Sequence, residues 1–98
     1  MKIKKTQNAG AMIVAVEGRL DTTTAPELEA ELKDSLDGVS ELVFDTEDLD
    51  YISSAGLRVL LSAQKAMAKK GEMKVIHVNE TVMEIFEVTG FADILNIE

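Results

Sequence analysis

Short apolar segments alternate with amphipathic helical segments along this chain, and that order limits the fold more than any other feature. Two strand-like segments, residues 3–7 and 11–17, flank the turn-forming sequence Asn8-Ala9-Gly10 and should pair antiparallel. The later strands alternate with predicted helices, and such crossovers join parallel strands. We therefore predict a single α/β domain over residues 1–98: a mixed β-sheet with an opening antiparallel hairpin and then β-α-β crossovers, packed with about three helices.

The helices and the remaining strands are predicted from apolar spacing and capping residues. The first helix should begin at a capping box, Thr24-Ala25-Pro26-Glu27, in which the Thr24 hydroxyl accepts from a free amide, and should end at Asp37-Gly38. Consecutive apolar residues within 41–45 are typical of a buried strand, and the acidic residues 46–50 are expected to form a solvated loop. The other predicted elements are a helix over 55–70, a strand over 73–78 that partly buries His77, a helix capped by Asn79 and stopped by Gly90, and a strand over 94–97.

The size and charge of the chain favour a binding or switching module over an enzyme. Ninety-eight residues allow one hydrophobic core but leave little room for a deep, enclosed active site. Eighteen acidic against 10 basic residues give a net charge of -8, which argues against a nucleic-acid partner. We expect neither catalysis nor a cofactor.

The lack of cysteine and the short apolar runs indicate the cellular compartment of the protein. Without cysteine there is no disulfide framework, no thiol nucleophile and no zinc-thiolate site, which fits a reducing compartment. The apolar run 11–16 is too short for a signal peptide or a membrane span. We expect a cytoplasmic protein with no direct membrane insertion.

The stretch Asp50-Tyr51-Ile52-Ser53-Ser54-Ala55-Gly56-Leu57 carries the most functional information. It brings two serines to the first turn of an amphipathic helix, where the backbone amides lack internal partners and favour negative charge. One interpretation is that Ser53 or Ser54 is simply the N-cap of this helix. The other is that a serine here holds a phosphate. Gly56 would allow another segment to approach closely.

Hydrolytic and metal-binding alternatives find little support. A serine hydrolase would need a glycine two residues before the nucleophile, where this chain has Ile52, and its only histidine, His77, lies in a predicted strand. The acidic residues 45–50 lack the central glycine and the terminal glutamate of an EF-hand calcium loop. We predict no catalytic residue and no metal site.

Three segments together resemble the STAS domain of anti-sigma factor antagonists. They are Tyr51 to Leu57, Gly18-Arg19-Leu20-Asp21 ahead of a Thr-Ala-x-Glu-Leu helix start, and Val82 to Phe91. The resemblance implies that Ser54 is the phosphorylated serine. It also implies a functional role for Asp21. We predict that the partner contacts Asp21 and the residues Thr22, Ser53, Ala55 and Gly56. Two positions depart from the commonest pattern: Ser53 stands where many members have aspartate, which makes it a second candidate acceptor, and Ala55 stands where many have serine or threonine.

The resemblance also implies a mechanism in transcription regulation. The unphosphorylated protein would bind an anti-sigma factor serine kinase and release the sigma factor. Phosphorylation would reverse this partner switching, and a PP2C-like phosphatase would reset it. The main alternative is a STAS-type accessory subunit of a lipid or solute transport system or of a sensor complex, because one fold supports several functions.

Overall fold

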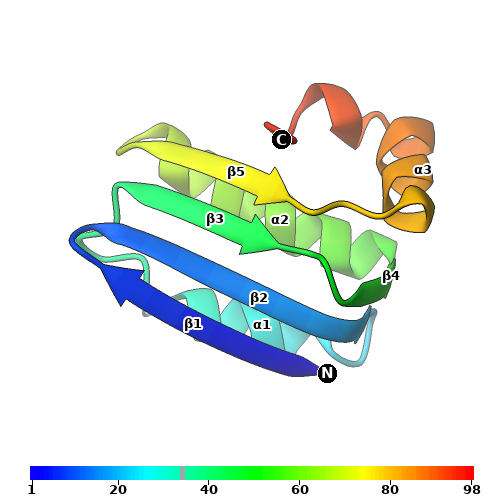
Figure 1. The fold of residues 1–98 in the computed structure, drawn as a ribbon, viewed down its shortest axis with the longest axis horizontal. Coiled ribbons are helices and arrows are strands. Elements are labelled where there is room, and N and C mark those ends of the chain that lie inside the picture. Colours follow the sequence, from blue (N-terminus) through cyan, green and yellow to red (C-terminus); the bar gives the residue numbers. More distant parts are fainter. Residues whose placement is uncertain (34) are drawn as a thin grey trace.

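The computed structural model describes residues 1–33 and 35–98 and confirms the predicted mixed sheet (Figure 1). Its elements are β1 (Lys2–Asn8), β2 (Ala11–Leu20), α1 (Ala25–Lys33), β3 (Glu41–Asp45), β4 (Leu49–Ile52), α2 (Ser54–Ala68), β5 (Glu72–Ile76), α3 (Glu80–Thr89) and a 3-10 helix, η1 (Phe91–Asp93).

The opening hairpin has a tighter turn than predicted. Asn8 pairs with Ala11, so the loop consists of Ala9 and Gly10, both with positive φ, 49° and 88°. Positive φ at both loop positions is typical of the two-residue turns that match the twist of paired strands. The sequence therefore predicted the hairpin correctly and its loop one residue too long.

The long strand β2 organises the rest of the sheet. The strand order is β1-β2-β3-β5, with β1 antiparallel to β2 and the other pairs parallel. β2 pairs with β3 through residues 11–15 and, beyond a register shift at Gly18, with β4 through residues 18–20. One strand thus supports two parallel neighbours in succession, and the second leads directly into α2.

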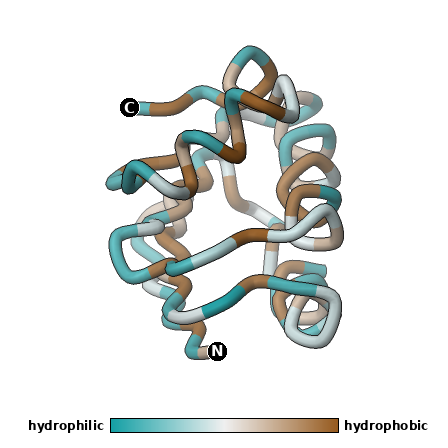
Figure 2. Tube along the Cα trace, turned by 90° about the vertical axis from the view of Figure 1, so that its right-hand side faces the viewer, coloured by the Kyte–Doolittle hydropathy of each residue, from teal (hydrophilic) through white to brown (hydrophobic). Residues whose placement is uncertain are grey.

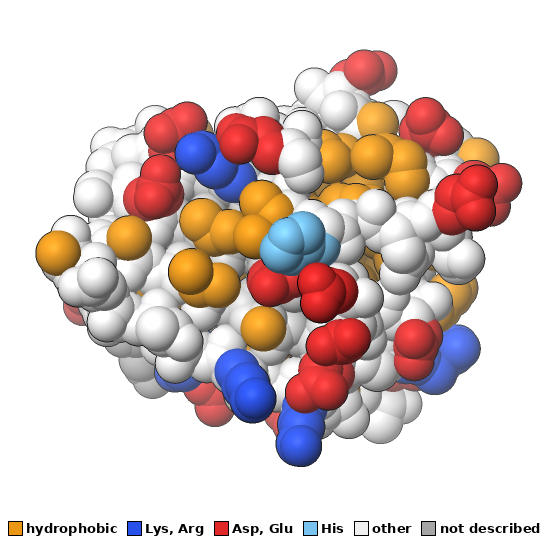
Figure 3. All heavy atoms as spheres, in the orientation of Figure 1, with side chains coloured by type: hydrophobic (Ala, Val, Ile, Leu, Met, Phe, Trp, Pro, Cys, Tyr) orange, Lys and Arg blue, Asp and Glu red, His pale blue; other side chains and the backbone are white. Residues whose placement is uncertain are grey.

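Two helices cover one face of this sheet. Figure 1 shows α1 and α2 behind the strands, and Figure 2, turned by 90°, shows them beside the sheet. The core lies between these layers and extends under α3, and its largest buried side chains are Phe44, Phe86, Met12, Leu20, Leu28, Leu42, Leu49, Ile52, Leu60, Met67 and Met73. The opposite face of the sheet points toward the viewer in Figure 3 and mixes apolar and charged side chains.

Strand β4 was missed by sequence analysis, which assigned residues 46–50 to a solvated loop. Leu49 and Ile52 are each 1% exposed, while Asp50 between them points outward. Four residues are too few to show a periodic pattern, and the segment forms a strand because β2 extends far enough to pair with it.

The C-terminal strand and the strand position of His77 were also predicted wrongly. Residues 91–95 form η1 and a turn that directs Leu95 into the core, so only Ile97 pairs with β5, through one bridge to Val75. His77 follows the end of β5 in a left-handed conformation, φ 57°, and its side chain is exposed. At this point the hydroxyl of the buried Thr46 donates to the carbonyls of Ile76 and His77, at 3.0 and 3.3 Å, and the Thr46 amide donates to the Ile76 carbonyl at 3.0 Å.

Helices α1 and α2 are both shorter than predicted. α2 spans Ser54–Ala68 instead of 55–70. The first helix, expected to reach Asp37-Gly38, ends at Lys33; Asp34 lies outside the described residues, and Ser35 is in a turn. The caps of α3 agree with prediction, since the Asn79 side chain accepts from the Val82 amide at 2.9 Å and Gly90 adopts φ 83°.

Candidate functional site

The predicted site residues lie at the carboxyl ends of two neighbouring parallel strands. Leu20, the last residue of β2, pairs with Ile52, the last residue of β4. One residue further, the Ser53 amide donates to the Leu20 carbonyl at 2.9 Å. The chain therefore leaves the sheet at Asp21 and at Ser53 side by side, and the structure brings together two segments about 30 residues apart in sequence.

Gly56 allows α2 to pack directly onto these strand ends. A Cβ atom at this position would lie 2.7 Å from Leu20 Cγ, 2.8 Å from Ile52 Cγ1 and 3.0 Å from the Leu20 carbonyl oxygen. Such distances are well inside van der Waals contact. The close approach predicted for Gly56 is confirmed. The residue is itself buried, and its contact with a partner stays a prediction.

The two serines at the start of α2 have opposite environments. Ser53 occupies the N-cap position, with φ -97° and ψ 177°, and its carbonyl accepts from the Leu57 amide at 2.9 Å. Its hydroxyl does not cap the helix, and it is buried without a hydrogen-bond partner among the described residues. Ser54 is the first residue of the helix and is exposed. The interpretation of Ser54 as the N-cap is therefore wrong.

Asp21 organises the turn that begins α1. Its Oδ1 accepts from the backbone amides of Thr23 and Thr24, at 3.0 and 3.1 Å, and its carbonyl accepts from the Ala25 amide at 2.7 Å. The hydrogen bond from the Thr24 amide is the largest cause that lowers the pKa of Asp21; the Thr23 amide, the Thr24 hydroxyl and Arg19 act in the same direction, and desolvation opposes them. Asp21 is therefore held as an ionised carboxylate.

The predicted capping box is accordingly wrong in its donor and acceptor roles. The Thr24 hydroxyl donates to the Arg19 carbonyl at 2.7 Å and accepts from the Asp21 amide at 2.9 Å, so it ties the turn to the end of β2 and does not cap α1. Asp21 was predicted from family resemblance; its local role follows from the ability of aspartate to bind amides two and three residues ahead.

An arginine and a tyrosine beside Asp21 were not identified as a pair by sequence analysis. Arg19 and Tyr51 are register partners on β2 and β4, and the guanidinium carbon lies 4.4 Å from the Tyr51 ring centroid. Arg19 Nε is 3.8 Å from Asp21 Oδ2. Both residues belong to the segments that carry the family resemblance, which was the available signal.

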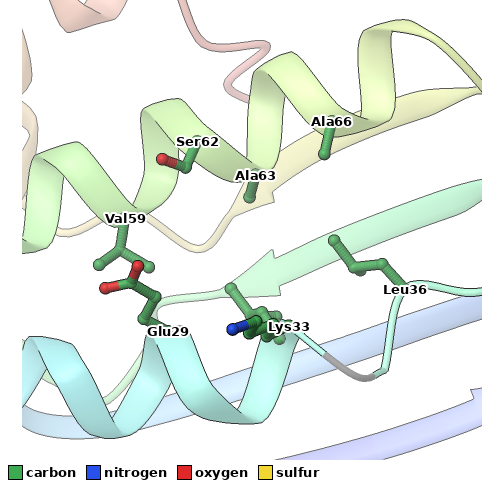
Figure 4. Close-up of a pocket in the computed structure, with 8 residues that line it drawn as sticks. Glu29, Lys33, Leu36, Val59, Ser62, Ala63 and Ala66 are labelled. Carbon is green, nitrogen blue, oxygen red and sulfur yellow. The ribbon is translucent and has the colours of Figure 1, made fainter.

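Thr22 and Ala55 border a cavity of about 380 Å³ between α1 and α2. Arg58 lines the same cavity one turn into α2. A second cavity of about 380 Å³ continues along the two helices and shares Glu29, Val59 and Ser62 with the first. Figure 4 shows that Glu29 and Lys33 of α1 face Val59, Ser62, Ala63 and Ala66 of α2 across it. Of the predicted contact residues, Thr22 is exposed and Ala55 half-buried.

Among residues 1–33 and 35–98, no helix is both long and apolar enough to cross a membrane. The same ranges hold no group of three or more His, Asp or Glu side chains arranged to bind a metal ion.

Comparison with known proteins gives one consistent family. The family model of the STAS domain matches residues 2–98. BtrV of Bordetella bronchiseptica, whose name assigns it to the anti-sigma factor antagonists, is 37% identical over 99 residues, which cover 99% of this chain and 85% of BtrV. The anti-sigma-B factor antagonist of Staphylococcus aureus is 31% identical over 86% of this chain and 80% of its own length.

Solved structures agree with the fold. An anti-sigma factor antagonist from Mycobacterium paratuberculosis superposes with a TM-score of 0.88 at 23% identity, covering 98% of this chain and 83% of that one. The antagonist SpoIIAA has been solved unphosphorylated and, from Bacillus, phosphorylated. Both forms give a TM-score of 0.77, and each alignment covers 99% of this chain. The unphosphorylated form is 14% identical and is matched over 87% of its length; the phosphorylated form is 15% identical and is matched over 91%.

Proposed function

This chain belongs to the STAS domain family and is related to its anti-sigma factor antagonists, and on that premise we propose that it is a cytoplasmic partner switch controlled by phosphorylation of Ser54. Unphosphorylated, it binds an anti-sigma factor serine kinase, which then releases its sigma factor. The kinase phosphorylates Ser54 and ends the interaction, and a PP2C-like phosphatase restores the free serine.

The observation that carries this proposal is the difference between the two serines. A kinase must reach the hydroxyl that it modifies, and Ser54 is exposed at the start of α2 whereas the Ser53 hydroxyl is buried. In the transfer, the Ser54 oxygen attacks the γ-phosphorus of ATP, its proton passes to a base of the kinase, and ADP leaves. The structure thus favours Ser54 over Ser53 as the acceptor.

The surroundings of Ser54 support a contact surface that phosphorylation would disrupt. Asp21, Thr22, Ser53 and Ala55 lie on the two segments that leave the sheet together, and Gly56 holds α2 against them. A phosphate adds about -1.5 to -2 charges, which a contact surface buried against a partner accommodates poorly. The first turn of α2 has no acidic residue, so the phosphate meets the favourable end of the helix dipole within the free protein.

The SpoIIAA structures support a local switch. The phosphorylated and unphosphorylated forms of that protein match this chain equally well, with the same TM-score of 0.77. Both forms therefore share the overall fold of this chain, which is consistent with a switch that acts at the surface it modifies. We therefore expect the phosphate to act by charge and shape at the contact surface.

A capture experiment tests the proposal. Immobilised wild type, Ser54→Ala and Ser54→Asp are incubated with native cell extract, and bound proteins are identified by mass spectrometry. The wild type and Ser54→Ala should retain an ATP-binding serine kinase, and Ser54→Asp should not. Thr81→Asp is the matched control, because Thr81 is exposed in the first turn of α3, another helix N-terminus.

The same experiment distinguishes the partner switch from the alternative function as an accessory subunit of a transport system or sensor complex. Incubation of the captured kinase with ATP should add one phosphate, which peptide mapping locates on Ser54. Recovery of transport or sensor components alone, equally by all variants, would reject the partner switch and support an accessory subunit. Phosphate solely on Ser53 would show that the acceptor is assigned to the wrong serine.

A further inference from the structure

Arg58 lies one helical turn beyond Ser54 on α2. Residues four apart on a helix are neighbours, with Cβ atoms roughly 5–6 Å apart. Long side chains on a helix point back toward its N-terminus and cover the preceding turn. Ser54 and Arg58 are both exposed, so the Arg58 side chain is free to reach back along α2 toward the Ser54 hydroxyl.

The charge of Arg58 is available. Among the described residues Arg58 forms no ion pair, although Glu29 borders the same cavity. Arg19, the other arginine near the site, is already positioned between the Tyr51 ring and Asp21. Of the basic side chains on α2, Arg58 alone stands within one turn of Ser54.

We propose that Arg58 binds the phosphate of phosphorylated Ser54. This rests on the proposed phosphorylation of Ser54 and adds the residue that receives the new charge. A guanidinium presents paired N–H donors that match two phosphate oxygens, which a lysine ammonium does not. Phosphorylation therefore changes the surface in two ways: it adds a dianion, and it draws Arg58 from the cavity between α1 and α2 toward the helix N-terminus.

The phosphate's second pKa gives a direct measure of this contact. A guanidinium favours the dianion over the monoanion, so it lowers the second pKa of the phosphate from its usual value of about 6. A helical pair four residues apart should lower it by about 0.3 unit, or about twofold in the acid dissociation constant. The helix N-terminus lowers the same pKa, so the contribution of Arg58 is the difference between variants.

The test uses phosphoserine incorporated at position 54 during protein synthesis, which requires no kinase. The second pKa is measured by phosphorus NMR in the otherwise wild-type chain, in Arg58→Gln, and in Lys65→Gln, an exposed position near the end of the same helix. Arg58→Gln should raise the pKa by about 0.3 unit, and Lys65→Gln should leave it unchanged. Arg58→Lys should recover part of the effect, because it keeps the charge and loses the paired geometry.

A second signal reports on the arginine itself. The Nε–H resonance of Arg58 should shift when position 54 carries phosphoserine in place of serine, and that of Arg19 should not. Equal phosphate pKa values with Arg58 and with Arg58→Gln, in chains whose circular dichroism is the same, would overturn the proposal. That result would leave the partner switch standing, whereas a kinase that fails to modify Ser54 would reject the switch without affecting the titration.

Discussion

Replacing Gly56 with alanine tests whether the close approach of α2 to the sheet builds the site. The added Cβ would lie 2.7 and 2.8 Å from two side-chain carbons and 3.0 Å from the Leu20 carbonyl oxygen, against ordinary contacts of about 3.5–4.0 Å. Leu20 and Ile52 are each 1% exposed, so neither has free space to move into. The helix or the strand ends must therefore shift.

The expected loss of stability combines two opposing terms. Overpacking in a well-packed core destabilises by about 1–3 kcal/mol, and three close contacts, one of them to backbone, favour the upper end of that range. Alanine gains about 1 kcal/mol over glycine in helix propensity. The net loss should be about 2 kcal/mol, which lowers the thermal midpoint of a chain of this size by about 10 °C.

Urea unfolding followed by circular dichroism measures this loss. Ala66→Gly, at an exposed position on the same helix, measures the difference in helix propensity between alanine and glycine without a steric contribution, and it should destabilise the protein by about 1 kcal/mol. Gly56→Ala should also weaken kinase binding, because the first turn of α2 moves relative to Asp21. A Gly56→Ala protein as stable as wild type, or more stable, would refute the steric argument.

Three further predictions concern single side chains. Ser54→Ala and Ser54→Asp should each change the free energy of unfolding by less than about 0.5 kcal/mol in urea melts, because Ser54 is exposed and Ser53 holds the N-cap position. In titration calorimetry, only Ser54→Asp should lose affinity for the kinase, and equal affinities would contradict the switch. Asp21→Ala should lower the thermal midpoint, and Asp21→Asn should lower it less because the asparagine oxygen still accepts from the Thr24 amide. The stability that comes from the lowered pKa of Asp21 is fully present above the pKa of Asp21 in the unfolded chain, and it should disappear as pH falls through the pKa of Asp21 in the folded protein. The hydrogen bond from His77 Nδ1 to Asp45, 3.0 Å long, is the largest cause that raises the pKa of His77 above 6.5. Its contribution to the stability of the fold should therefore be complete below pH 6.5 and vanish as pH rises through the pKa of His77 in the folded protein. Proton NMR should show a lower His77 pKa in Asp45→Asn, and an unchanged value would disprove the contact.

The features that the sequence predicted correctly depend on neighbouring residues. The hairpin follows from Ala9 and Gly10, which adopt the positive φ that a two-residue turn requires. The start and end of α3 follow from Asn79 and Gly90, whose capping roles need only residues within one helical turn. The order of strands and crossover helices then limits the topology to a mixed sheet.

The candidate site was predicted in part, and by resemblance more than by physical reasoning. The position of Ser54 on an exposed first turn agrees with local helix signals. Nothing in those signals says that the adjacent Ser53 hydroxyl is buried, since that depends on β2 and β4 beside it. Nor do they give the pairing of Arg19 with Tyr51, because the register between two distant strands brings these side chains together.

The sequence by itself determined the opening hairpin and the two caps of α3, because each depends on φ, ψ and hydrogen bonds within a few residues. Only the tertiary structure decided that residues 49–52 form a strand and that Asp21 lies beside the start of α2. A four-residue segment has too little local preference to form a strand, and it does so here because the extended end of β2 supplies its hydrogen bonds. The same pairing places Leu20 under Gly56 and so brings the two halves of the site together.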